Sequence, residues 1–182
     1  ELVRLSVVDG ERLTWVARAQ GARQGLRYDP DMGSDARLSC SSSGWAWLSS
    51  LSDDEGLALV AKQGLGLPDQ FGPGAPTTLR AVLDAVHTTR ERGYSMTTDT
   101  YSLGLSAISA PVRLANQPAM GVLTIAGPTV RFTAERMQSL VPELLSVASQ
   151  LAAASGVSPF FNLTADTGES GSATGRTPIS AV

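Results

Sequence analysis

The sequence is short of the residues on which most catalytic and metal sites depend, since it holds one cysteine, Cys40, and one histidine, His87, in 182 residues. A single cysteine excludes an intrachain disulfide, which fits a reducing compartment. No apolar run approaches the roughly 20 residues of a membrane helix, and the sequence does not open with a signal peptide. We therefore expect a cytoplasmic protein with no membrane partner.

The sequence also lacks an excess of positive charge. Its 14 basic and 17 acidic residues give a formal net charge of −3 and a pI of about 5.1. Domains that bind nucleic acid on their own usually carry a basic face, so we expect no direct DNA contact from these residues. With 42% hydrophobic and 17% charged residues, the composition is that of a globular domain rather than a disordered one.

No catalytic constellation is evident from the sequence. A catalytic triad would have to bring His87 to a distant serine, and the G-x-S-x-G segment that presents a nucleophilic serine is missing. Cys40 precedes an expected helix start, where the pKa of a thiol can be lowered. A small hydrolase that uses Cys40 or a serine of 41–43 therefore stays open as an alternative. We expect no enzyme, no metal and no cofactor, because neither zinc-ligand spacing nor a phosphate-binding glycine motif is present.

Hydrophobic periodicity predicts both strands and helices. The first two strands flank Asp9-Gly10, a typical hairpin turn, and a capping box joins Ser52 to Glu55 at the start of a helix. The expected strands are 2–8, 13–18, 94–98, 105–112 and 119–126, with a further short strand at 26–28. The expected helices are 41–51, 52–64, 78–92 and 133–156. This order predicts an α+β fold with an antiparallel β-sheet and helices packed on it.

The composition changes near residue 160. Residues 161–182 consist mostly of Gly, Ser, Thr and Ala, so we expect one domain over 1–160 and a low-complexity tail over 161–182. The chain opens at Glu1 directly in a strand-like segment, from which we expect a partner domain before residue 1.

A run of serines opens the first expected helix. Hydroxyls and backbone N–H groups at a helix start favour an anion such as a carboxylate. The alternative is that these serines only cap the helix and that Gly44 allows close packing.

Five blocks of the sequence resemble the C-terminal effector-binding domain of the IclR family of bacterial transcription regulators. Residues 38–48 are similar to the family's LHATASGKALL segment and residues 104–112 to its GxxCIAAPV segment. Residues 123–128, with Arg131, are similar to LSVSGPxxR, and the remaining blocks are 26–33 and 90–94. Their order and spacing extend the resemblance over roughly residues 1–160.

The resemblance implies a GAF-like sensor fold and a regulator, such as a repressor, that responds to a small-molecule effector. It implies a winged helix-turn-helix domain before residue 1, through which alone the protein would bind DNA. It also implies a homo-oligomer, either a dimer or a tetramer. A GAF-like sensor fused to a different output is the alternative interpretation.

The resemblance also implies an effector pocket over one face of the sheet, lined by the start of the helix in the LHATASG segment. Carried over residue by residue, the implied ligand-binding residues are Met32, Ser41, Ser42, Ser43, Gly44, Thr97, Ala107, Thr124 and Ala126. Strand alternation independently puts Thr124 and Ala126 on one face.

The sequence departs from the family at several of these positions. Thr97 stands where an acidic residue is frequent, Ala107 where cysteine is frequent and Ala126 where serine is frequent. A pocket without these bonding groups should bind a small, highly polar acid less well. We therefore expect a carboxylate with an apolar or aromatic part. Trp45 replaces a common lysine, and we expect one of Trp45 and Trp47 to pack inward and the other to contact a partner subunit or the pocket.

Overall fold

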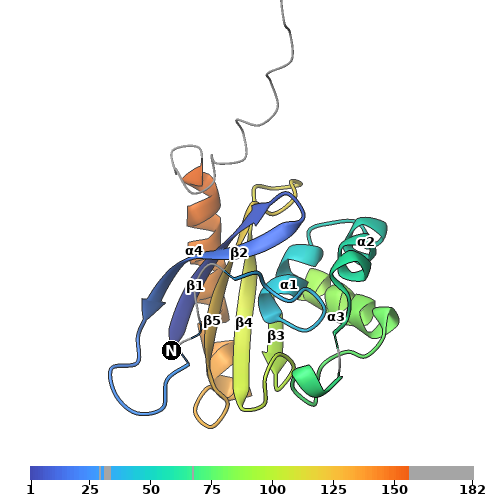
Figure 1. Cartoon of the computed structure of the whole chain (residues 1–182). Coiled ribbons are helices and arrows are strands. Elements are labelled where there is room, and N and C mark those ends of the chain that lie inside the picture. Colours follow the sequence, from blue (N-terminus) through green and yellow to red (C-terminus); the bar gives the residue numbers. More distant parts are fainter. Residues whose placement is uncertain (29, 31–33, 67, 156–182) are drawn as a thin grey trace, which may run out of the picture.

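The computed structural model describes residues 1–28, 30, 34–66 and 68–155. Along the chain come two strands, three α-helices, three strands and a last α-helix (Figure 1). The α+β order predicted from the sequence is confirmed. The expected tail over 161–182 lies outside the described residues.

One antiparallel sheet of five strands runs through the domain in the order β2-β1-β5-β4-β3. The strands are β1 (Leu2–Asp9), β2 (Arg12–Gln20), β3 (Ser95–Thr98), β4 (Leu105–Val112) and β5 (Gly121–Pro128). β1 and β2 form the predicted hairpin, in which Gly10 has a φ of +58°. Glycine adopts this left-handed conformation without a Cβ clash.

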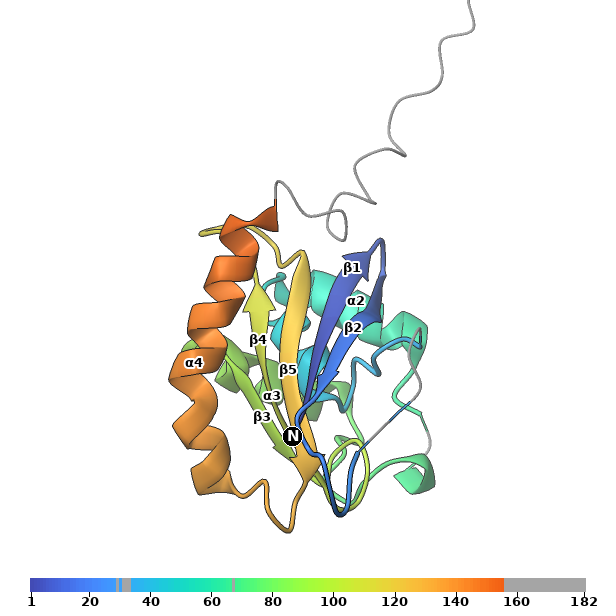
Figure 2. The same ribbon diagram turned by 90° about the vertical axis from the view of Figure 1, so that its left-hand side faces the viewer.

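The helices cover both faces of the sheet, so that the domain has three layers (Figures 1 and 2). The helices are α1 (Ser42–Leu48), α2 (Asp53–Gln63), α3 (Leu79–Arg92) and α4 (Ala134–Ala153), with a single 3₁₀ turn, η1, at Pro68–Gln70. α4 lies on one face, against β4 and β5, and α1 lies on the other, against β3, β4 and β5. α2 and α3 lie on the same side of the sheet as α1 (Figure 1).

Hydroxyl side chains begin each of the four α-helices. In every case the side chain of the N-cap residue accepts a hydrogen bond from a backbone N–H in the first turn, at Ser41, Ser52, Thr78 and Thr133. Such bonds satisfy donors that the helix leaves without a partner. The predicted capping box at Ser52 and Glu55 is confirmed.

Each face of the sheet has its own hydrophobic core. One cluster, under α1 and α3, includes Trp15, Leu38 and Leu48. The other, under α4, includes Phe132 and Met137. Because β5 is the central strand, with α1 against one face and α4 against the other, residues on both of its faces are largely buried.

Three local predictions differ from the structure. Residues 26–28 form no strand, because the chain turns at Gly25 (φ +77°) and Leu26 projects into solvent. Trp45 and Trp47 are both buried, since α1 is enclosed between the sheet and α3. α1 ends at Leu48 and α4 at Ala153, each earlier than predicted.

Candidate functional site

Two adjacent rows of residues cross the sheet on the face that α1 covers. In the first row Arg4 of β1 pairs with Thr124 of β5, which pairs with Ser109 of β4, which pairs with Ser95 of β3. In the second row the same strands contribute Leu2, Ala126, Ala107 and Thr97. All eight residues are buried, so the first row places one charge and three hydroxyls inside the protein.

The hydroxyls of these rows bond to one another and to the neighbouring helix. The Oγ of Ser109 lies 2.8 Å from Oγ1 of Thr124, and the Oγ of Ser95 lies 2.6 Å from that of Ser42 in α1. Ser41 and Ser43 are joined in the same way, with 3.3 Å between their hydroxyl oxygens. Each hydroxyl of the serine run therefore has at least one hydrogen-bond partner within the fold.

A small cavity lies where the start of α1 crosses these rows. It brings together seven of the nine residues that the resemblance implied, from α1 and its N-cap, β3, β4 and β5: Ser41, Ser42, Ser43, Thr97, Ala107, Thr124 and Ala126. The volume of the cavity is about 20 Å³, which is room for about one water molecule. Five of these seven residues carry hydroxyls and two, Ala107 and Ala126, carry only methyl groups.

Of the remaining two implied residues, only Gly44 can be placed relative to the cavity, and it is not among the residues that line it. Met32 lies outside the described residues. Gly44 packs against the preceding loop, where an added Cβ would lie 2.7 Å from the Cα of Leu38 and 2.9 Å from the carbonyl oxygen of Arg37. Close packing is therefore the role that the structure gives to Gly44.

Five further residues line the cavity that the sequence did not predict: Arg4, Trp15, Tyr28, Tyr101 and Leu105. Arg4 is 5% exposed. Its guanidinium carbon lies 3.9 Å from the centroid of the Trp15 ring and 5.4 Å from that of Tyr28, close enough for cation–π attraction. Burial lowers the pKa of Arg4 and raises that of Tyr28.

A signal for Arg4 is present in the sequence. The alternation of β1 puts Val3 and Leu5 on one face and Leu2, Arg4 and Ser6 on the other. Strands that alternate in this way usually have one face on the core and one face exposed to solvent. The sequence would therefore place Arg4 on the exposed face. In the structure the second face is also covered, and Arg4 and Ser6 are both buried.

Cys40 and His87 do not form a catalytic pair in the structure. Burial raises the pKa of the Cys40 thiol to about 11, opposite to the lowered pKa that a nucleophile needs. The Nε2 of His87 lies 2.7 Å from Oδ2 of Asp53, whose other oxygen accepts a hydrogen bond from Arg90. These bonds lower the pKa of Asp53 and form a partly exposed link between α2 and α3.

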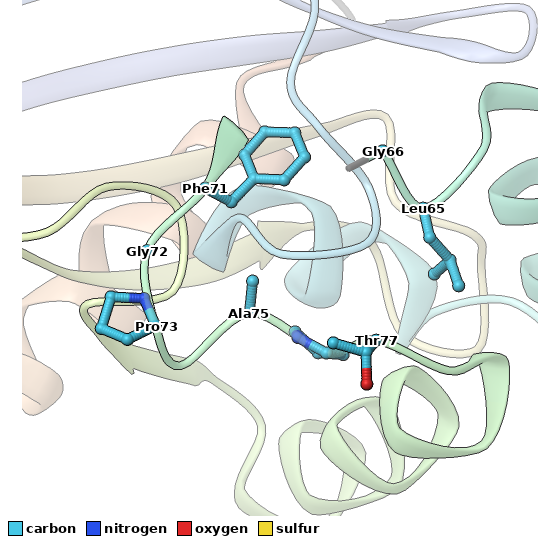
Figure 3. Close-up of a pocket in the computed structure, with 8 residues that line it drawn as sticks. Leu65, Gly66, Phe71, Gly72, Pro73, Ala75 and Thr77 are labelled. Atoms are coloured by element: carbon cyan, nitrogen blue, oxygen red, sulfur yellow. The ribbon is translucent and has the colours of Figure 1, made fainter. Parts of the chain in front are cut away.

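A larger hollow lies elsewhere, in the connection between α2 and α3 (Figure 3). Its volume is about 280 Å³ and its lining is Leu65, Gly66, Phe71, Gly72, Pro73, Ala75, Pro76 and Thr77. None of these side chains carries a charge, and one hydroxyl, of Thr77, is present. The cavity beside α1 therefore offers a ligand more charged and hydrogen-bonding groups than this hollow does.

Two further findings concern the part of the chain that the structure describes. No three His, Cys, Asp or Glu side chains gather there as they would around a metal ion. Within the same residues, no helix combines the length and the apolar character needed to cross a membrane.

Comparison with known proteins gives one family. A family model described as "Bacterial transcriptional regulator IclR C-terminal" matches residues 1–153. The acetate operon repressor of Salmonella typhimurium is 26% identical over 157 residues, which cover 86% of this chain and 56% of that protein. The repressor AllR of Escherichia coli K12 is 24% identical, over 76% of this chain and 50% of that protein. This chain therefore spans about half the length of these relatives.

Solved structures show the same fold. A regulator from Rhodococcus sp. RHA1 superposes with a TM-score of 0.72 at 23% identity, covering 84% of this chain and 60% of that one. A double mutant of the inducer-binding domain of the PobR transcription factor from Acinetobacter, in complex with 3-hydroxybenzoic acid, has a TM-score of 0.70 at 24% identity. That match covers 83% of this chain and 87% of the PobR chain.

Proposed function

This chain belongs to the IclR family of bacterial transcriptional regulators, and we propose that its cavity beside α1 binds a small-molecule effector. Binding would change the DNA affinity of a region outside this chain. The observation that carries the proposal is that seven residues, far apart in sequence, line one cavity over the sheet.

The walls of the cavity favour an effector with both an acidic and an apolar part. Trp15, Tyr28 and Tyr101 offer aromatic surface, while Arg4 offers a positive charge. The 3-hydroxybenzoic acid bound by the double mutant of the PobR domain is a molecule of this class. We therefore propose an aromatic or acyl carboxylate as the effector, with Met32 and the serines 41–43 near it.

An acid of this size does not fit the closed cavity of about 20 Å³. Tyr28 and Tyr101 lie on connecting segments rather than on helices or strands. Because such segments open at a lower free-energy cost than packed helices and strands, we expect these two side chains to move when the effector enters.

The wider role of the protein is part of the same proposal. We propose a cytoplasmic repressor that forms a dimer or tetramer and binds DNA through a winged helix-turn-helix region. We propose no catalytic activity for this chain, because the thiol of Cys40 stays protonated at neutral pH and His87 is engaged by Asp53.

A thermal-shift screen of carboxylic acids on the purified chain tests the proposal. We expect 3-hydroxybenzoate and related acids to raise the midpoint of unfolding, because a ligand that binds only the folded state stabilises it. Ala107→Phe fills the cavity and should abolish the shift. Ala115→Phe, in the exposed loop after β4, is the matched control and should keep it. Stabilisation by glyoxylate-like acids alone would refute the proposed effector class.

A further inference from the structure

Arg4, Trp15 and Tyr28 form an unsatisfied, donor-rich wall of the cavity. Building on the proposed function, we infer that this wall, rather than the serine run of α1, binds the carboxylate of the effector. The three residues come from β1, β2 and the segment after β2, and each lines the cavity. Arg4 and Trp15 lie outside the five blocks that resemble the family, and Tyr28 lies in the block 26–33.

Four buried polar atoms of this wall lack a hydrogen-bond partner within the part of the chain that the structure describes. They are Nε and Nη1 of Arg4, Nε1 of Trp15 and the hydroxyl of Tyr28. Buried polar groups in folded proteins nearly always have a partner. All four atoms belong to groups that donate hydrogen bonds. Their position on three side chains in contact therefore favours a ligand that accepts hydrogen bonds.

The positive charge of Arg4 also favours an anionic ligand. Arg4 is 5% exposed and pairs with no carboxylate of the described residues, so its burial costs hydration with little electrostatic return from them. The ring of Trp15, 3.9 Å away, offsets part of that cost by cation–π attraction. A carboxylate would supply the opposite charge and accept two parallel bonds from the guanidinium.

The serines of α1 have less to offer an anion. The hydroxyl of Ser42 bonds to Ser95, and the hydroxyl of Ser41 bonds to both Ser43 and the N–H of Gly44. These bonds occupy two of the three hydroxyl hydrogens of the serine run, whereas four donor atoms of Arg4, Trp15 and Tyr28 have no partner among the described residues. We therefore orient the effector with its acid group toward β1 and β2.

Isothermal titration of the wild-type chain with 3-hydroxybenzoate and with its neutral amide, 3-hydroxybenzamide, tests this orientation. We expect the acid to bind more tightly than the amide. Arg4→Met should weaken acid binding by roughly 10- to 100-fold, the range expected when a charged hydrogen bond is removed, and leave amide binding unchanged. Arg80→Gln, which removes an exposed arginine from α3, should change neither.

Two further measurements separate recognition from a structural role. In the absence of ligand, Arg4→Met should unfold at the same temperature as the wild type or higher, because it removes an unpartnered buried charge. Tyr28→Phe, which removes a single hydroxyl, should weaken acid binding alone.

The outcomes distinguish this inference from the proposed function. If Arg4→Met and Tyr28→Phe bind the acid as the wild type does while Ala107→Phe does not, the cavity stands and the inference is wrong. If the acid and the amide bind the wild type equally, the inference is also wrong. If neither binds, both the inference and the proposed effector class fail.

Discussion

At the residue scale, two helical glycines differ in the space that is available for a side chain. A Cβ on Gly44 would meet backbone atoms at 2.7–2.9 Å, whereas one on Gly56 would lie 3.6 Å from the side chain of Leu48. We expect Gly44→Ala to destabilise the protein by about 1–3 kcal/mol, since the backbone cannot yield as a side chain can. Gly56→Ala should instead stabilise it by about 0.5–1 kcal/mol, the usual gain in helix propensity. Urea unfolding of both variants checks this, and equal effects would contradict the packing role of Gly44.

The buried thiol of Cys40 gives a second prediction at this scale. Its pKa of about 11 means that little thiolate is present at pH 8, so we expect a thiol reagent to label Cys40 only after unfolding. Rapid labelling of the native protein would reopen the possibility of a cysteine nucleophile.

The same thiol links stability to pH. The pKa of Cys40 rises from 9.0 to about 11 on folding, so its contribution is complete below pH 9 and is lost as the pH rises through 11. The free energy of unfolding of the wild type should therefore fall by about 2–3 kcal/mol relative to Cys40→Ala over this interval. Parallel pH profiles of the two proteins would show that the thiol is not desolvated.

At the scale of the elements, Arg90 connects α3 to the segment between α1 and α2. Its guanidinium donates to the carbonyl oxygens of Ser49 and Leu51 and to the carboxylate of Asp53. We expect Arg90→Ala to lower the free energy of unfolding by about 1.5–3 kcal/mol, because charged donors are lost from backbone acceptors. Arg92→Ala, at an exposed position of the same helix, is the control and should change it by less than about 0.5 kcal/mol. Similar losses in both variants would contradict a specific connection.

The elements themselves were largely predictable from local patterns. Alternation marked the five strands and capping residues marked the helix starts, because both depend on neighbouring residues in the sequence. The short strand at 26–28 was wrong, since a strand also needs a partner and that segment has none. Arg4 was missed for a related reason. Its burial depends on the pairing of β1 with both β2 and β5, which local alternation does not reveal.

At the scale of the whole molecule, the cavity depends on register across the sheet. The resemblance named Thr97, Ala107, Thr124 and Ala126, and the pairing of β3, β4 and β5 places them side by side. The resemblance did not assign Arg4, Trp15 or Tyr28 to the site, because these residues come together only when β2 pairs with β1 and the segment after β2 reaches the cavity. The sequence could therefore indicate the hydroxyl wall of the cavity but not the charged one.

We propose that the effector binds in the cavity beside α1 and in no other hollow. Two-dimensional ¹H–¹⁵N NMR of the chain, titrated with 3-hydroxybenzoate, tests it most directly, because each backbone amide reports its own surroundings. We predict that the largest shifts fall on Arg4, Ser42, Ser43, Ala107 and Thr124. Shifts confined to the residues around the hollow between α2 and α3, or the absence of any shift at saturating acid, would show that the cavity beside α1 is not the effector site.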